Sequence, residues 1–254
     1  MKITLLGTGS FIADLKHGGP GYLLEINDKK ILIDAGSGVQ QKLLQLDVNP
    51  DDLDAIYITH QHADHATDLF AIIFRRFINY LSDKKEPKKE LFVYGPRDTQ
   101  KLIDDLGKVF KLESMSGWKW VQGIDLDGEK DFDDFTVEAF QVEHLNVVSN
   151  IYRFEAEGKA IVFSGDTPKN KGIEDATKNV DIAIMDASNS KDSVPDKVHT
   201  NTFEIAEICQ NSCVKKIVLS HFRSINYDKD LVAEVKEGFD GEVILGEDMM
   251  EIEL

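Results

Sequence analysis

Apolar residues along the chain form two kinds of pattern. Short β-branched runs such as Leu53-Asp-Ala-Ile-Tyr-Ile-Thr indicate strands, whereas the apolar residues between Leu69 and Leu81 recur at helical spacing. Strands are predicted near residues 2–7, 21–27, 30–34, 54–59, 91–94, 118–122, 135–142, 150–155, 160–164, 181–185, 216–220 and 242–246. Helices are predicted near residues 37–46, 68–81, 98–110, 170–178, 202–212 and 228–238. Meanders mixed with crossover helices predict an α/β fold of two mixed sheets, covered by helices on their outer faces.

The chain has the length and composition of one α/β domain. No Pro/Gly/Ser-rich linker divides its 254 residues, so we expect residues 1–254 to form a single domain. No apolar stretch reaches membrane-spanning length, and Met1-Lys-Ile-Thr leads into a strand without a signal-peptide pattern. These features predict a cytoplasmic protein that does not engage a membrane.

Two patterns that suggest chemistry are interpreted as structural. Cys209 and Cys213 lie four residues apart around the helix predicted near 202–212, and we expect reduced, core-facing thiols rather than a disulfide or a metal pair. The Gly-Thr-Gly and Gly-Ser-Gly segments at 7–9 and 36–38 lack the Lys-Ser/Thr of a nucleotide-binding loop. Tight turns are therefore the favoured interpretation of these glycines.

Potential metal ligands are concentrated where a strand gives way to a helix. The segment Thr59-His-Gln-His-Ala-Asp-His places His60, His62, Asp64 and His65 within six positions. Because side chains alternate along a strand, His60 and His62 point the same way, and the turn can aim Asp64 and His65 at a second point nearby. Imidazole and carboxylate at this density favour two metal ions over the alternative, a His-rich surface loop that binds nothing.

These residues resemble the signature of the metallo-β-lactamase-fold hydrolases, in which His-x-His-x-Asp-His is followed by three separate ligands. His144, Asp166 and His221 each follow a predicted strand, in the order in which that family places its later ligands. The resemblance extends to Ile3-Thr-Leu-Leu-Gly-Thr-Gly-Ser and Leu32-Ile-Asp-Ala-Gly-Ser-Gly, and so covers essentially the whole chain. It implies a four-layer αβ/βα sandwich with a metal site at one edge, between the sheets.

The resemblance also implies roles for the ligands. One metal would be held by His60, His62 and His144, the other by Asp64, His65 and His221, and both by a bridging Asp166. Zinc is the expected metal, with manganese or iron as alternatives, because His/Asp sites accept all three. A metal-bridging hydroxide would be the nucleophile of a hydrolysis, and Asp64 would orient it. Asp34 would either accept the free N–H of a ligand histidine or cap a turn.

Within the superfamily the chain is most similar to the ribonuclease Z and small phosphodiesterase branch. Val198-His-Thr-Asn-Thr resembles the His-Ser-Thr element of that branch, so His199 is expected to contact the substrate or protonate the leaving oxygen; the alternative is a surface histidine beside a helix cap. Two departures stand out. Only 22 residues separate His144 from Asp166, where ribonuclease Z carries a tRNA-gripping arm, and Met185-Asp-Ala-Ser replaces the usual His-Glu-Ala-Thr.

Charge also bears on the substrate. With 29 basic and 46 acidic residues the formal net charge is −17, which repels polyanions unless a basic patch intervenes. Arg75-Arg76 and the run from Lys84 to Lys89 could form such a patch, although a solvated helix face and loop is the favoured interpretation. Trp118 and Trp120 could line a substrate cleft, but packing in the core or at its rim is favoured.

The leading function is therefore hydrolysis of a small phosphodiester, such as a cyclic nucleotide or a phospholipid head-group ester. One alternative is a tRNA 3′-end endonuclease that works without the usual arm, or with an arm from residues 66–143. Another is a thioester or lactone hydrolase. A non-catalytic metal scaffold or sensor is less well supported, because the ligand set is complete. The net charge disfavours a nucleic-acid partner, and homodimers are common in the resembling branch.

Overall fold

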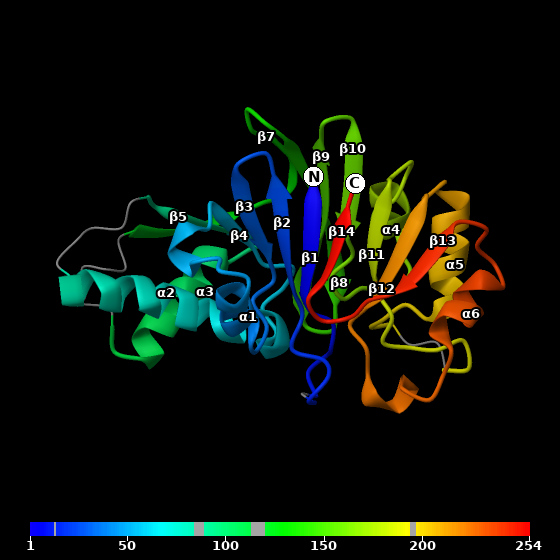
Figure 1. Cartoon of the computed structure of the whole chain (residues 1–254), viewed down its shortest axis with the longest axis horizontal. Helices are drawn as coiled ribbons and strands as arrows, with labels where there is room; N and C mark the ends of the chain where they lie inside the picture. Colours follow the sequence, from blue (N-terminus) through cyan, green and yellow to red (C-terminus); the bar gives the residue numbers. More distant parts are fainter. Residues whose placement is uncertain (13, 84–88, 113–119, 194–196) are drawn as a thin grey trace.

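The computed structural model describes residues 1–12, 14–83, 89–112, 120–193 and 197–254. Within them, two mixed sheets lie face to face between helices, in four layers (Figure 1). The first sheet has the order β14 (Met250–Glu253), β1 (Lys2–Gly7), β2 (Gly21–Ile26), β3 (Lys29–Ile33), β4 (Ala55–Tyr57), β5 (Leu91–Gly95) and β6 (Val121–Asp125). The second has the order β13 (Glu242–Leu245), β12 (Lys216–Ser220), β11 (Ile182–Asp186), β10 (Lys159–Phe163), β9 (Val147–Ala156), β8 (Thr136–His144) and β7 (Gly128–Asp131). The predicted α/β arrangement is confirmed.

Helices cover the outer face of each sheet. The first sheet is covered by α1 (Val39–Gln45), α2 (Ala63–Asp83) and α3 (Thr99–Val109), and the second by α4 (Lys171–Ala176), α5 (Thr202–Asn211) and α6 (Leu231–Lys236). Two short 3₁₀ helices, η1 (Pro50–Asp52) and η3 (Ser224–Asn226), lie in connecting segments. Within the described residues, no helix is both long and apolar enough to cross a bilayer.

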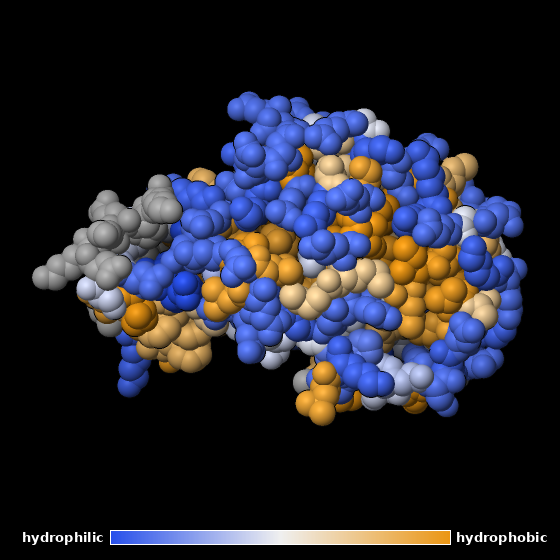
Figure 2. Space-filling view, in the orientation of Figure 1, coloured by the Kyte–Doolittle hydropathy of each residue, from blue (hydrophilic) through white to orange (hydrophobic). Residues whose placement is uncertain are grey.

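Because side chains alternate along the strands, apolar residues form three layers: one between the two sheets and one between each sheet and its helices. In β4, Ile56 packs against the helices of the first sheet, whereas Tyr57 packs into the layer between the two sheets. Strands buried on both faces have near-continuous apolar runs, which is why the sequence pattern identified most of them. On the face shown in Figure 2, hydrophilic residues cover much of the surface and are interrupted by apolar patches.

The topology brings strand ends of both sheets to one edge of the sandwich. In the first sheet β3, β4 and β5 are parallel, and in the second β10, β11 and β12 are parallel. Strand β8 runs in the same direction as β10, because both are antiparallel to β9. The loops that follow these strands therefore converge at the lower edge in Figure 1, while the two chain termini lie toward the upper edge.

Several element boundaries differ from the prediction. Helix α2 begins at Ala63, whereas the sequence pattern predicted a start near 68. The pattern missed the first turn because that turn contains no apolar run. Strands β7 and β14 were not predicted, because each has only four residues and lies at a sheet edge, and β7 also lacks apolar alternation. The strand expected near 118–122 begins at Val121, and residues 118 and 119 lie outside the described ranges.

Two expectations about side chains outside the metal cluster are corrected, and a third falls on residues that the structure does not describe. Arg76 is 2 % exposed and donates to the carbonyl oxygens of Lys89 and Asp51, both at 2.9 Å, so it forms neither a solvated face nor a basic patch. Cys209 is buried as expected, but Cys213 is exposed and lies beyond the end of α5. Residues 84–88 of the basic run lie outside the described ranges.

Trp120 packs in the fold, as favoured from the sequence. It is buried, and its ring makes an edge-on contact with Tyr80 of α2 at a centroid distance of 4.6 Å. Trp118 lies outside the described residues.

Candidate metal centre

The structure brings all seven sequence-predicted ligands to the shared edge of the two sheets. They form two groups whose nitrogen and oxygen atoms lie within 4.8 Å of one another: His60, His62 and His144 in one, and Asp64, His65, Asp166 and His221 in the other. Six of the chain's seven histidines belong to these groups or to the neighbouring His199. Such a concentration at one edge indicates a binding centre rather than chance packing.

The first sheet supplies its ligands from the segment between β4 and α2. His60 and His62 precede the helix, and Asp64 and His65 lie in its first turn. The loop after β3 holds that turn closely, since the backbone N–H of Ala35 donates to the carbonyl of His65 at 2.8 Å. A side chain at Gly36 would place its Cβ 2.3 Å from the carbonyl oxygen of Asp64. Glycine is therefore needed there for a close approach of backbones, a constraint that the predicted tight turn did not include.

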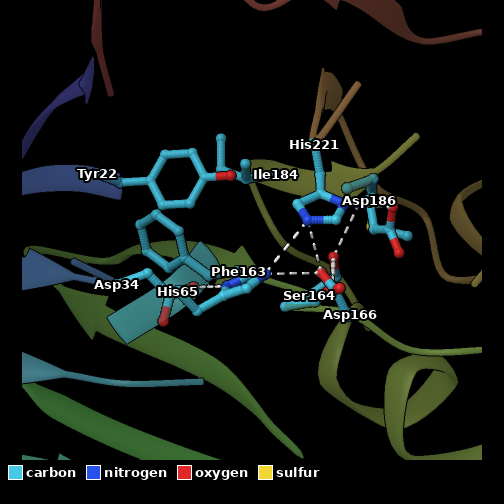
Figure 3. Close-up of a pocket in the computed structure, with 11 residues that line it drawn as sticks. Tyr22, Asp34, His65, Phe163, Ser164, Asp166, Ile184, Asp186 and His221 are labelled. Atoms are coloured by element: carbon cyan, nitrogen blue, oxygen red, sulfur yellow. Dashed lines mark hydrogen bonds and ion pairs between the residues drawn. The ribbon is translucent and has the colours of Figure 1, made fainter. Parts of the chain in front are cut away.

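Asp166, from the loop after β10, lies between the two histidine groups. Its Oδ1 is 3.2 Å from His65 Nε2 and 3.3 Å from His221 Nε2. Its Oδ2 is 3.7 Å from His144 Nε2 and 4.0 Å from His60 Nε2. Figure 3 shows the imidazoles of His65 and His221 converging on this carboxylate. Each oxygen of Asp166 thus faces a different set of imidazoles.

The histidines are oriented by hydrogen bonds from their second ring nitrogen. His65 Nδ1 lies 2.8 Å from Asp34 Oδ2, which confirms the ligand-orienting alternative for Asp34. Asp34 also accepts from the backbone N–H and the hydroxyl of Thr59, at 2.7 and 2.9 Å. His144 Nδ1 lies 3.0 Å from the carbonyl oxygen of Val198. Such partners fix which nitrogen is free to bind a metal.

His221 and His199 are connected through Asp186, the last residue of β11. Ser188 Oγ lies 2.8 Å from His221 Nδ1 and donates to Asp186 Oδ1 at 2.5 Å. The other oxygen of Asp186 lies 2.6 Å from His199 Nδ1. His199 also stands near the centre itself, with its ring 5.2 Å from that of His144. The histidine predicted to be catalytic therefore lies beside the two ligand groups.

Asp186 and Ser188 were not identified from the sequence as functional residues. The departure from His-Glu-Ala-Thr indicates an altered acid/base partner for the later histidine, and the shorter carboxylate of Asp186 nevertheless reaches His199. An aspartate at the carboxyl end of a parallel strand, beside the ends that carry ligands, was the available signal.

Two site residues adopt backbone conformations that are unusual for their type. Asp34 has φ 56° and His221 has φ 60°, in the left-handed region that non-glycine residues rarely adopt. Each follows a strand directly, so the chain turns sharply and presents the side chain over the sheet edge. Strain of this kind costs on the order of 1–3 kcal/mol and is concentrated at functional sites.

Burial and charge together divide the histidines into two electrostatic classes. Burial lowers the pKa of His60 and of His144 below the ordinary value. Burial acts in the same direction on His65 and His221, but nearby carboxylates, above all Asp166, raise the pKa of His65 well above its ordinary value and that of His221 to about 10. Burial opposes ionisation of Asp166, yet His221 and His65 hold its pKa well below its ordinary range. The centre is therefore one that favours positive charge.

The residues present fit a pair of divalent cations. Asp166 Oδ1 is buried and accepts no hydrogen bond from the described residues, so a lone pair faces the space between the imidazoles. Imidazole and carboxylate groups are the ligands of hydrolytic zinc and related metals. The composition, burial and grouping of these side chains are those of a dinuclear His/Asp metal site.

Comparisons with known proteins agree with this arrangement. Over its full length the chain is 28 % identical to a ribonuclease Z from Archaeoglobus fulgidus, and the alignment covers 97 % of that protein. The structure superposes on the metallo-β-lactamase-fold protein YhfI from Bacillus subtilis with a TM-score of 0.83 and 23 % identity, covering 99 % of this chain and 98 % of that one. It superposes on the short form of human tRNase Z with a TM-score of 0.78 and 22 % identity, covering 100 % and 99 %.

The family model of the anti-Pycsar protein Apyc1 matches residues 1–241. That span runs from β1 through α6 and ends before β13 and β14. It contains all seven residues of the two ligand groups. With its two mixed sheets and buried His/Asp centre, the chain is a metal-dependent hydrolase of the metallo-β-lactamase fold, in the ribonuclease Z-like branch, and it belongs to the anti-Pycsar Apyc1 family.

Proposed function

We propose that the protein is a dinuclear metal-dependent phosphodiesterase that acts on a small diester, with cyclic nucleotides as the favoured substrate class. The observation that carries this proposal is the position of Asp166, whose two oxygens face different sets of imidazoles. In this assignment His60, His62 and His144 hold one ion, Asp64, His65 and His221 hold the other, and Asp166 bridges both. The imidazole-rich donor set favours zinc, with manganese or iron as alternatives.

Individual residues of the site are assigned separate roles in hydrolysis. Two bound divalent ions would supply an activated water and would polarise a phosphoryl oxygen of the substrate. Asp64, with Oδ2 3.4 Å from His221 Nε2 and only partly buried, is positioned to accept a proton from the attacking water and orient it. Asp34 and Ser188 keep His65 and His221 in their ligating orientations.

His199 is assigned as the general acid. Its Nδ1 is paired with Asp186, so the imidazole is held in one orientation beside the two ligand groups. Its side chain is 14 % exposed, which allows contact with a substrate that enters from solvent. In that position it can donate a proton to the departing oxygen as the phosphorus–oxygen bond breaks.

A small substrate is supported by the shape and charge of the chain. The segment between His144 and Asp166 is a simple hairpin of β9 and β10, which leaves no room there for a projecting arm. The net charge of −17 opposes the approach of a polyanion. Membership of the Apyc1 family, a family of cyclic nucleotide phosphodiesterases, supports the same choice.

A second candidate is a ribonuclease Z-like endonuclease that matures tRNA 3′ ends. The full-length similarity to the ribonuclease Z of Archaeoglobus fulgidus favours it. Both candidates require the same centre. Because the apolar layer between the sheets combines residues from both halves of the chain, we also propose that residues 1–254 act as one domain.

Metal content tests the ligand assignment. Protein purified without chelator should contain about two transition-metal equivalents per chain, because seven donor residues exceed what one ion needs. His62→Ala should lose metal and turnover with little change in melting temperature, since His62 lies in a half-buried loop. His17→Ala, the matched histidine outside the two groups, should keep both metals. Elemental analysis that stays near zero after reconstitution would refute the assignment.

Metal removal should expose a pH dependence of stability. In the metal-free protein the raised pKa values of His65 and His221 stabilise the fold fully below about pH 6.5, the ordinary histidine pKa. The contribution of His221 is lost as the pH rises toward about 10, at up to about 1.4 kcal/mol per pH unit, and that of His65 is lost in the same direction. Urea melts of chelator-treated protein at pH 7 and pH 9 should show the decrease.

The metal-loaded protein is the control for these melts, because its ligand histidines are already neutral. Asp166→Asn, which removes the carboxylate that raises both pKa values, should flatten the decrease in the metal-free state. Equal stability of the metal-free wild type at the two pH values would contradict the electrostatic account.

Substrate choice is tested by a panel assayed with metal-loaded protein. Cyclic nucleotides and bis-p-nitrophenyl phosphate should be hydrolysed, whereas a tRNA precursor should bind weakly, with an affinity that falls steeply as salt rises. A thioester in the same panel tests the acyl-hydrolase alternative. Tight tRNA binding at physiological ionic strength would favour the endonuclease, and turnover of the thioester alone would exclude both phosphodiester proposals.

His199→Ala should separate chemistry from metal binding. The variant should keep both metals but lose at least about tenfold in kcat, because general-acid assistance is worth ~10²–10⁴-fold. Elemental analysis together with steady-state rates between pH 6 and 9 provides the measurement. If the variant retains wild-type turnover across that range, His199 is not the general acid.

A further inference from the structure

A second cavity, separate from the metal centre, opens between the two sheets. It has a volume of about 470 Å³ and lies where β3, β4 and β5 begin, whereas the metal ligands follow the ends of strands. The turn between β7 and β8 closes it from the second sheet. This volume is within the usual range of small-molecule sites. The residues that line the cavity are absent from the two ligand groups and from the partners of His199.

Five aromatic rings line this cavity and form a connected cluster. They belong to Tyr57, Phe92, Tyr94, Phe132 and Phe135. Tyr57 stacks on Tyr94 at a centroid distance of 4.7 Å, and Phe132 stacks on Phe135 at 4.6 Å. Tyr94 and Phe132 join the two pairs by an edge-on contact at 5.9 Å. The cluster therefore presents several ring faces and edges at one place.

Two of these rings already lie near a positively charged side chain of the protein. The Lys130 ammonium lies 5.4 Å from the centroid of Phe132 and 6.0 Å from that of Tyr94, within the range of cation–π attraction. Lys130 lies on β7 and is not one of the described residues that line the cavity. Phe132 and Tyr94 thus attract a positive charge that the chain itself supplies, and both residues also line the cavity.

The charge of the lining residues also favours a cation. Its charged lining residues are two lysines and four acids: Lys29, Lys89, Asp54, Glu90, Asp133 and Asp134. Both lysines lie within ion-pairing distance of Asp54, at 3.9 and 3.0 Å. The remaining acids leave the rim net negative.

We propose that this cavity binds a small organic cation, namely a quaternary ammonium compound. The aromatic cluster supplies cation–π attraction, and the acidic rim supplies long-range attraction. The site lies at the opposite ends of the strands from the metal centre. Binding there does not depend on the proposed phosphodiesterase activity.

Choline and its neutral isostere 3,3-dimethylbutan-1-ol test the proposal, because the two have nearly the same shape and both carry a hydroxyl. Calorimetry on the metal-loaded protein at physiological salt should show saturable binding of choline. Its affinity should be at least about tenfold higher than that of the isostere, as expected of a partly desolvated cation–π contact. Equal affinities, or no saturable binding of choline at millimolar concentration, would overturn the proposal.

Two substitutions locate the binding. Phe132→Leu removes one ring but keeps an apolar side chain, and should abolish the difference between choline and the isostere while leaving hydrolysis of bis-p-nitrophenyl phosphate unchanged. Phe110→Leu alters an exposed ring outside the cavity and should bind choline like the wild type. If Phe132→Leu binds choline with wild-type preference, the cavity is not the site. The wild-type comparison stands even if that variant fails to fold.

Discussion

The buried carboxylate of Asp166 is the constraint on which the rest of the site depends. Removing an ionised carboxylate from water costs several kcal/mol unless positive charge or hydrogen bonds compensate. Here one oxygen has no hydrogen-bond donor among the described residues, and compensation comes from imidazoles on both sides. The raised pKa values of His65 and His221 follow above all from this charge, with further contributions from Asp34 beside His65 and from Asp186 and Asp64 beside His221. A site that holds an anion in this way has a strong electrostatic preference for bound cations.

The fold makes such a convergence of ligands possible. Each sheet contributes parallel strands whose carboxyl ends meet at the shared edge, so ligands far apart in the sequence lie within a few ångströms. The sharp turns at Asp34 and His221 have strained backbone angles, and they direct both side chains over that edge. The strain is maintained by the two-sheet core, where rings such as Tyr57, Tyr152 and Phe154 pack edge to face.

The sequence predicted much of this centre because its residues carry chemistry directly. The His60–His65 segment could be recognised by residue type and spacing, and His144, Asp166 and His221 through the resemblance to the metallo-β-lactamase-fold hydrolases. Contacts between segments that are distant in the sequence were not predicted in this way. That Asp186 reaches His199, that Arg76 is buried, and that Cys213 is exposed depend on side-chain directions set by tertiary packing. Polar four-residue edge strands such as β7 lack the apolar alternation that identifies a strand.

The central claim is that Asp166 bridges two cations held by the two ligand groups. Anomalous diffraction from crystals grown with zinc or manganese tests it most directly, because it locates each ion independently of activity. The account predicts two peaks, one beside His60, His62 and His144 and one beside Asp64, His65 and His221, with the Asp166 carboxylate between them. A single peak, or two peaks that do not share Asp166, would contradict it.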